Sequence, residues 1–245
     1  LLSRSCFAGM PLGLICLLPF LNVIALSFSD KIAAASGQVT FWPVNFTTDA
    51  YRYVLDQGAF WRSFLISLER VALGGGLGIF LTVLSAYPLS KSSAVFKMRT
   101  VYVWYFFITM LFSGGLIPGY VVITGLGLKN TIWALVLPGA VSAYNILLML
   151  NFYRQLPSEL EEAAFIDGAG HFRTWFHIYL PCSIPSIATI ALFTIVGQWN
   201  AWFDGLIYMT KTELYPLQSY LQTIVTRLDF QNMTAEELKQ IGRAH

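Results

Sequence analysis

The feature that most constrains the fold is a series of apolar runs, each about 20 residues long, the length at which a helix crosses the hydrocarbon core of a bilayer. Of all residues, 56% are hydrophobic and 11% are charged, whereas soluble domains carry about 25% charged residues. The sequence therefore predicts an all-α, polytopic transmembrane helical bundle. Its five visible spans cover residues 5–28, 62–88, 101–126, 131–153 and 183–209.

The positions of lysine and arginine predict the orientation, because positively charged loops stay on the cytoplasmic side of the membrane. Arg4 precedes the first span, and the remaining loops on the same side carry Lys91, Lys97, Arg99, Arg154 and Arg173. The alternate loops carry a balanced set of acids and bases. We therefore expect a cytoplasmic N-terminus and a cytoplasmic stretch at residues 158–181.

The charge balance and the missing motifs exclude several classes of function. A net charge of +2 over 245 residues does not provide the basic surface that binds nucleic-acid phosphates, so nucleic acid is not an expected partner. Membrane lipid is an expected partner because of the apolar spans. Cys6, Cys16 and Cys182 have no CxxC spacing and are interpreted as small hydrophobic residues. The sequence has no GxxxxGK[ST] phosphate loop. We expect no catalytic residue, no metal site and no nucleotide site in this chain.

Prolines and glycines interrupt the predicted spans. Pro118 and Pro138 lie inside the third and fourth spans, where the missing N–H is expected to kink a helix. Gly74 and Gly78 lie four residues apart in the second span and predict a face for close helix packing. Arg70, near the outer end of that span, is expected to find a partner on another helix or to extend toward the interface. These features indicate a packed bundle.

Residues 158–181 are the one long polar interruption. Ser158 and Glu161 have the S-x-x-E spacing of a capping box, so a helix is expected to begin at 158 and to end at Gly168. A second helix, from about residue 170, carries a stripe of aromatic residues at Phe172, Trp175, Phe176 and Tyr179. The first three of them are interpreted as interfacial anchors. We predict a helix–turn–helix on the cytoplasmic face, with small and acidic residues at its apex, shaped for contact with another protein.

This stretch resembles the EAA motif of membrane subunits of binding-protein-dependent ABC importers. The resemblance rests on EAA at 162–164, DGA at 167–169 and IYLP at 178–181. The longer form ELEEAAFIDGA…F…I.LP…P is similar to the carbohydrate-uptake branch, and in particular to the second membrane subunit of maltose-type permeases. The match covers almost the whole chain in order and spacing.

The resemblance implies a type I ABC importer in the bacterial inner membrane. Its expected partners are a second homologous permease subunit, two ATP-binding cassette subunits and an extracytoplasmic solute-binding protein. ATP and Mg²⁺ would be bound by the partner ATPase, so this chain is expected to be a transport subunit and not an enzyme. Residues 1–245 would form one transmembrane domain, whose 157–181 loop would dock on the ATPase. The implied coupling residues are Glu162, Ala163, Ala164, Asp167, Gly168 and Ala169.

Permeases of this type generally have six spans here. The tail that begins LYPLQSYLQ, at residue 214, resembles the family's outer segment before its last span. We therefore expect a sixth helix that is missing from this sequence.

Polar and aromatic residues inside the spans are candidates for the translocation pathway, since polar groups at membrane depth face a bundle interior or an aqueous cavity. The residues singled out are Trp199, Asn200, Tyr144 and Asn145. Tryptophan faces stack on sugar rings and amides bind hydroxyls. The alternative is that these groups bond other helices or form an interfacial belt.

The expected solute is an oligosaccharide or polysaccharide, because the GLIPGYVVITGLGLKNTIWALVLPGA segment looks most like permeases associated with such uptake; an alginate-like polyuronate is one specific candidate. Two alternatives stay open: a permease of the same kind for a non-sugar solute, and an intramembrane enzyme. The enzyme would need a Ser–His, paired Asp or HExxH arrangement, which the sequence does not show.

Overall fold

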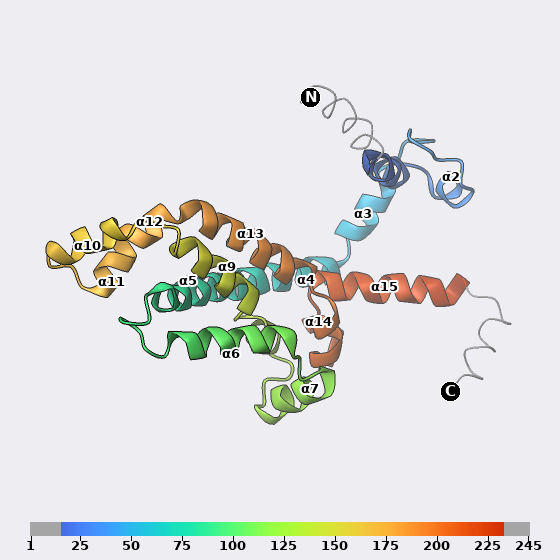
Figure 1. Ribbon diagram of the computed structural model, residues 1–245. Helices are drawn as coiled ribbons and strands as arrows, with labels where there is room; N and C mark the ends of the chain where they lie inside the picture. Colours follow the sequence, from blue (N-terminus) through green and yellow to red (C-terminus); the bar gives the residue numbers. More distant parts are fainter. Residues whose placement is uncertain (1–15, 233–245) are drawn as a thin grey trace, which may run out of the picture. The chain divides into compact units, whose positions relative to one another are not determined.

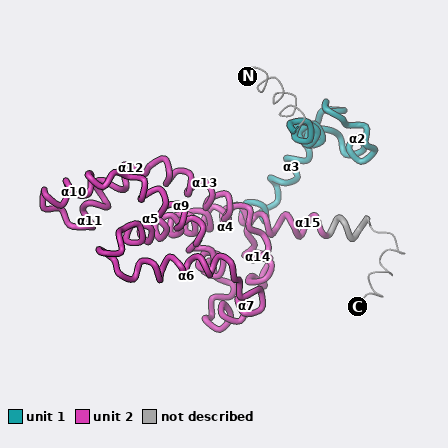
Figure 2. Tube along the Cα trace, viewed as in Figure 1, with its two compact units in different colours: residues 1–61 teal, residues 62–245 magenta. Residues whose placement is uncertain are grey.

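The computed structural model describes residues 16–232, with side chains to residue 226. The chain divides into two compact units, residues 1–61 and residues 62–245 (Figure 2), which are described here one at a time. All regular structure in the described part of the chain is helical. This confirms the all-α prediction, while the single domain predicted over 1–245 stays a prediction.

The first unit holds the helix Cys16–Ser27, followed by α2 (Lys31–Ala35) and α3 (Asp49–Leu55). The Ser29 hydroxyl donates to the carbonyl of Ala25 at 2.6 Å and accepts from the amide of Val44 at 3.0 Å. This hydroxyl ties the loop after the helix back onto the helix end. The part of the predicted first span before residue 16 lies outside the described residues.

The second unit begins at residue 62, within one helix of 33 residues, Gly58–Ser90. It comprises α4 (Gly58–Arg70), the π-helical turn η1 (Val71–Gly75) and α5 (Gly76–Ser90). This helix contains the predicted second span. We call it the long helix; at about 1.5 Å per residue it exceeds the roughly 30 Å hydrocarbon core of a bilayer.

The third and fourth predicted spans are broken rather than kinked. In the third, α6 (Arg99–Leu111) and α7 (Leu116–Gly125) are bent by 113°. The break falls at residues 112–115, where Gly115 has φ +86°, and the prediction of a kink at Pro118 was wrong. Pro118 lies in the first turn of α7, where its missing N–H removes no intrahelical hydrogen bond.

In the fourth predicted span, α8 (Trp133–Val136) stops before Pro138, and α9 (Ala143–Tyr153) starts afresh after it. Pro138 therefore ends a helix instead of kinking one. Such non-helical backbone is tolerated at membrane depth where it is buried in protein or lines a cavity. Asn145 donates its backbone N–H to the hydroxyl of the α9 N-cap, Ser142, at 3.3 Å.

After α10 (Ser158–Ile166), the chain forms α11 (His171–Thr174), the π-helical turn η2 (Trp175–Tyr179), α12 (Leu180–Cys182) and α13 (Ile184–Asn200). The pieces before and after residue 183 are bent by 79°. The chain then forms α14 (Phe203–Tyr208), η3 (Thr212–Leu214) and α15 (Leu217–Asn232). Among the described residues, one helix is long and apolar enough to cross a membrane, or up to three if each bent pair is one span.

The core of the second unit lies where α5, α9, η2 and α13 meet (Figure 1). Ile146, Met149 and Ile190 are fully buried there. A Cβ atom on Gly74 would lie 2.9 Å from the Gln198 side chain, and one on Gly78 would lie 3.2 Å from Thr194. The prediction of a close-packing glycine face is therefore confirmed, and the face packs on α13. By contrast, α6 has no buried residue, as expected of a helix that faces lipid.

Candidate functional site

The 157–181 loop is held in a defined shape by the end of α10. Gly168, at φ +77°, adopts the left-handed conformation after the helix. The amide of Ala169 donates to the carbonyl of Ala164 at 2.9 Å, and that of Gly168 donates to Phe165 at 3.0 Å. This pair of hydrogen bonds is a Schellman motif, which favours glycine at the left-handed position. The predicted helix end at Gly168 is confirmed.

The start of α10 at Ser158 is also confirmed, but the predicted capping box is wrong. Pro157 is the N-cap, and no side chain caps the helix. Glu161 does not reach back to the helix start, because both of its carboxylate oxygens bind elsewhere. Oε1 lies 2.7 Å from Nζ of Lys91, and Oε2 accepts from the Tyr179 hydroxyl at 2.8 Å.

Lys91 follows the last residue of α5 and is buried, with 6% of its surface exposed. Its Nζ atom lies 3.9 Å from the ring centre of Tyr87 and 4.0 Å from that of Tyr179. A cation between two aromatic faces is attracted by both rings. Burial lowers the pKa of Lys91, and the ion pair with Glu161 opposes that shift. We call these four residues, Tyr87, Lys91, Glu161 and Tyr179, the Lys91 joint.

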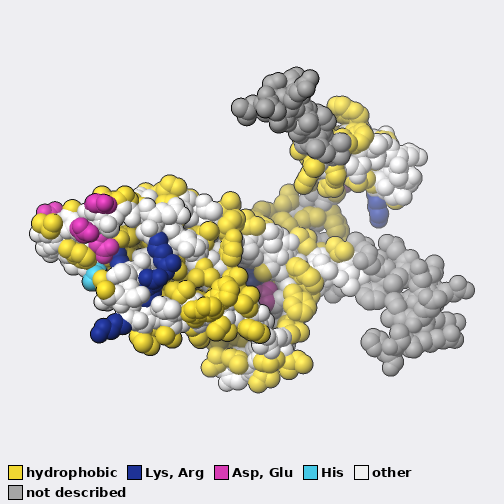
Figure 3. Space-filling view, viewed as in Figure 1, with side chains coloured by type: hydrophobic (Ala, Val, Ile, Leu, Met, Phe, Trp, Pro, Cys, Tyr) yellow, Lys and Arg dark blue, Asp and Glu magenta, His cyan; other side chains and the backbone are white. Residues whose placement is uncertain are grey.

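The implied coupling residues divide between surface and interior. Glu162, Ala163, Asp167 and Gly168 are exposed, Ala169 is half-buried, and Ala164 is buried with 8% exposed. Acidic side chains gather at the end of the second unit where α10 and α11 lie (Figure 3). The loop therefore exposes a carboxylate, a methyl group and a bare glycine, while Ala164 is buried.

The aromatic stripe does not form one interfacial face. Trp175 and Tyr179 are buried, with 6% and 5% exposed, whereas Phe172 and Phe176 are 72% and 54% exposed. The π-helical turn at Trp175–Tyr179 changes the periodicity from 3.6 residues per turn. Interfacial anchoring therefore fits Phe172 and Phe176, while Trp175 belongs to the core.

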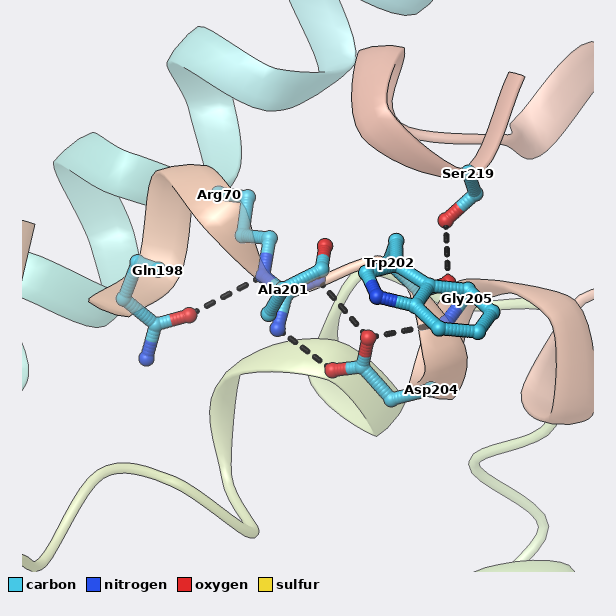
Figure 4. A network of polar contacts seen from close by, with 7 residues as sticks. All are labelled: Arg70, Gln198, Ala201, Trp202, Asp204, Gly205 and Ser219. Atoms are coloured by element: carbon cyan, nitrogen blue, oxygen red, sulfur yellow. Dashed lines mark hydrogen bonds and ion pairs between the residues drawn. The ribbon is translucent and has the colours of Figure 1, made fainter. Parts of the chain in front are cut away.

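A second polar site is built around Arg70, at the end of α4 (Figure 4). Only 3% of Arg70 is exposed. Its Nε donates to Oε1 of Gln198 at 3.0 Å, and its Nη1 donates to Oδ1 of Asp204 at 3.0 Å and to the carbonyl of Ala201 at 3.2 Å. Nη2 pairs with the second oxygen of Asp204. The expected partner of Arg70 on another helix is confirmed, and it lies on α13 and α14.

A cavity of about 420 Å³ adjoins this network. Its polar lining includes the side chains of Asn145, Thr194 and Gln198. Gly139 and Gly197 also line the cavity and add no side chain to it. The Asn145 amide donates to the Thr194 hydroxyl at 3.3 Å. Because Arg70 holds Oε1 of Gln198, the Nε2 group of that amide, which can only donate, is the one left for another partner.

The four predicted pathway residues do not lie together around this cavity. Asn145 lines it and is buried, with 7% exposed. Tyr144, Trp199 and Asn200 are not among its lining residues. Tyr144 is 55% exposed, Asn200 is exposed at the end of α13, and Trp199 packs edge-on against Phe64 with ring centres 6.1 Å apart.

Sequence reasoning did not select Lys91, Glu161 or Gln198 as site residues. The available signal was a charged or amide side chain within or directly beside an apolar helix, where such groups need partners. The partners themselves lie far away in the sequence, so the pattern alone does not name them.

The comparison with known families decides the class of protein. Residues 74–235 match the family described as binding-protein-dependent transport system inner membrane component. The chain belongs to this family. It is thus an inner-membrane component of a bacterial transport system, as the EAA resemblance implied, and family membership favours transport over the intramembrane-enzyme alternative.

Two curated relatives and one solved structure extend the comparison. The chain is 40% identical to the polygalacturonan/rhamnogalacturonan transport system permease protein YtcP of Bacillus subtilis (strain 168), over 87% of this chain and 74% of that protein. It is 42% identical to protein LplC of the same organism, over 89% and 73%. It also resembles a chain in the crystal structure of a bacterial ABC transporter involved in the import of the acidic polysaccharide alginate, with a TM-score of 0.85 and 29% identity, covering 98% of this chain and 84% of that chain.

Proposed function

We propose that this permease forms half of the translocation pathway of an ATP-driven importer and docks on a cytoplasmic ATPase through the 157–181 loop. The observation that carries the proposal is that Glu162, Ala163 and Gly168 are all exposed on a loop whose shape is fixed by the hydrogen bonds at the end of α10. Small residues permit close approach in a cleft, and an exposed carboxylate offers a charge-assisted hydrogen bond to a basic partner residue.

The complete assembly would contain a second homologous permease subunit, two ATP-binding cassette subunits and an extracytoplasmic solute-binding protein. The partner ATPases bind ATP and Mg²⁺ and carry out hydrolysis. The N-terminus and the 157–181 loop lie on the cytoplasmic side, which the positive loops support. The 420 Å³ cavity at Asn145 and Gln198 belongs to the pathway.

The proposed solute is an oligosaccharide or polysaccharide of acidic sugars. Two names support this class: YtcP is named for polygalacturonan and rhamnogalacturonan, and the solved transporter imports alginate. The cavity supports it as well, because amide and hydroxyl groups at Asn145, Thr194 and Gln198 bind sugar hydroxyls and carboxylates.

The coupling role is tested with Glu162→Lys in the purified assembly, with Glu159→Gln, an exposed acid on the same helix, as the control. We expect Glu162→Lys to insert normally but to lose solute-stimulated ATP hydrolysis, and Glu159→Gln to keep it. A permease that purifies as a lone active chain, or a Glu162→Lys variant that stays coupled, would contradict the proposal.

The solute class is tested by uptake into proteoliposomes that contain the assembly. Oligogalacturonides and oligoalginates are compared with neutral oligosaccharides of the same length and with a small non-sugar anion. We expect uptake of an acidic oligosaccharide. Uptake of the neutral sugar alone would correct the solute class, and uptake of the non-sugar anion alone would place the chain in a different branch of the family.

A further inference from the structure

We propose that the Lys91 joint carries the movement of α10 to the long helix, so that Lys91 and Glu161 are positioning residues for coupling. The inference rests on the proposed docking of the 157–181 loop on an ATPase. It adds the internal connection by which a displacement at that surface reaches the membrane-spanning part of the chain.

The two adjacent glutamates of α10 have different environments. Glu162 is exposed, whereas Glu161 uses both carboxylate oxygens within the chain, one for Lys91 and one for Tyr179. Within the described part of the chain, Glu161 is the one side chain of α10 that makes a hydrogen bond or ion pair to another element. The outer glutamate is free for a partner protein, and the inner one holds α10 to the body of the permease.

The contacts around Lys91 favour movement of the four residues of the joint together over breakage of the ion pair. Lys91 is held at its ammonium group by Glu161 and by the rings of Tyr87 and Tyr179, and at its backbone carbonyl by Arg99, which donates at 3.0 Å. A displacement of Glu161 that broke the ion pair would leave a buried charge without a partner, which is strongly unfavourable. The lower-energy response is that the end of α5 follows α10.

The long helix then connects this end to the cavity. Arg70, a buried cation within this helix, binds Gln198 and Asp204 on α13 and α14. Lys91 and Arg70 lie roughly 30 Å apart along the helix at about 1.5 Å per residue, which is about the thickness of the hydrocarbon core. One continuous helix therefore leads from the residue bonded to the docking loop, Lys91, to the residue bonded to the wall of the cavity, Arg70.

The test measures coupling without any solute. Phe193 lines the cavity, and the substitution Phe193→Cys is made in a background without the native cysteines. The rate of labelling at this position by a methanethiosulfonate reagent is measured in the reconstituted assembly, with and without ATP and vanadate. The variants are Glu161→Gln, Lys91→Met, Lys91→Arg and the doubly apolar Lys91→Met with Glu161→Leu. Glu159→Gln, on the exposed face of the same helix, is the matched control.

We expect Glu161→Gln and Lys91→Met to keep the ATPase bound while the nucleotide-dependent change in labelling rate falls about tenfold, a magnitude typical of coupling between sites. Glu159→Gln should keep the full response, and Lys91→Arg should keep most of it. Replacing a buried ion pair by apolar residues commonly restores stability, so the doubly apolar variant should regain thermal stability without regaining the response.

Three results would overturn the inference. The first is an unchanged labelling response in both single variants. The second is loss of the ATPase from the complex in those variants, because the joint would then shape the docking surface instead of transmitting its movement. The third is recovery of the response together with stability in the doubly apolar variant, which would make the joint purely structural.

Failure of the docking proposal gives a different result. If Glu162→Lys keeps both the bound ATPase and the full response, the 157–181 loop does not dock on the ATPase through Glu162, whatever the variants of the joint show.

Discussion

The guanidinium group of Arg70 and the carboxylate of Asp204 form an ion pair that joins α4 to α14 inside the second unit. The Arg70 side chain is 4% exposed and that of Asp204 is 28% exposed. Asp204 also accepts the backbone N–H of Gly205 at 2.9 Å. The pair therefore lines the cavity beside Gln198 and holds the turn between α13 and α14 against α4.

Removing one partner of this pair should destabilise the permease strongly. We expect Arg70→Met to lower the free energy of unfolding by about 3 kcal/mol, the lower end for breaking a buried pair, because Asp204 keeps some contact with solvent. Thermal unfolding of the purified chain measures the effect. Arg62→Met is the control, since the Arg62–Glu213 pair at 3.9 Å is 58% and 72% exposed and should be worth less than about 1 kcal/mol. Equal losses in the two variants would contradict the assignment.

Gly205 should tolerate no side chain. A Cβ atom there would overlap the Ser219 hydroxyl and lie 3.0 Å from Cδ of Pro216. The Ser219 hydroxyl is fixed because it donates to the carbonyl of Trp202 at 2.6 Å. We expect Gly205→Ala to cost about 1–3 kcal/mol through overpacking.

The matched control for Gly205→Ala is Gly76→Ala. Gly76 is also helical, but a Cβ atom there meets nothing within 4 Å. Alanine should therefore raise the stability of the long helix slightly, by about 0.5–1 kcal/mol. Thermal unfolding midpoints that move in the same direction in both variants would show that the contact at Gly205 is not the cause.

The two halves of the aromatic stripe should respond differently to truncation. Trp175→Ala removes a buried ring from the main core and should lower the free energy of unfolding by about 3–5 kcal/mol. Phe172→Ala, at a residue that is 72% exposed, should change it by less than about 0.5 kcal/mol. Comparable unfolding temperatures for the two variants would return Trp175 to the interfacial role predicted from sequence.

Substitution of Asn145 should change the KM for solute uptake more than the stability of the permease. Asn145→Leu removes a donor and an acceptor from the cavity wall and should raise the KM for uptake about three- to tenfold, the loss of roughly one neutral hydrogen bond, while basal ATP hydrolysis stays unchanged. Tyr144→Phe, at the exposed neighbour outside the cavity, serves as the comparison. A larger effect of Tyr144→Phe than of Asn145→Leu would place the pathway on the other face of α9.

Local sequence was sufficient for the features whose cause is local. The end of α10 follows from the glycine after it, Gly168. Its start at Ser158 was predicted correctly from a capping box that does not form, and Pro157 is the residue at the N-cap. The packing face of Gly74 and Gly78 follows from their spacing, because residues four apart lie on the same side of a helix. The helical class follows from apolar runs of membrane length, since a backbone in lipid must satisfy its own hydrogen bonds.

Tertiary structure decided the features that depend on residues far apart in the chain. The length of an apolar run predicted a continuous third span, and its proline predicted a kink at Pro118, yet the chain turns at residues 112–115. The spacing of Ser158 and Glu161 predicted a capping box, but a buried lysine directly after α5 offers the carboxylate a stronger, charge-assisted partner. In the same way, Asn145 lines the cavity and Tyr144 beside it does not. Sequence spacing fixes which residues share a helix face, while the packing of other helices determines which of those faces is buried and what it binds.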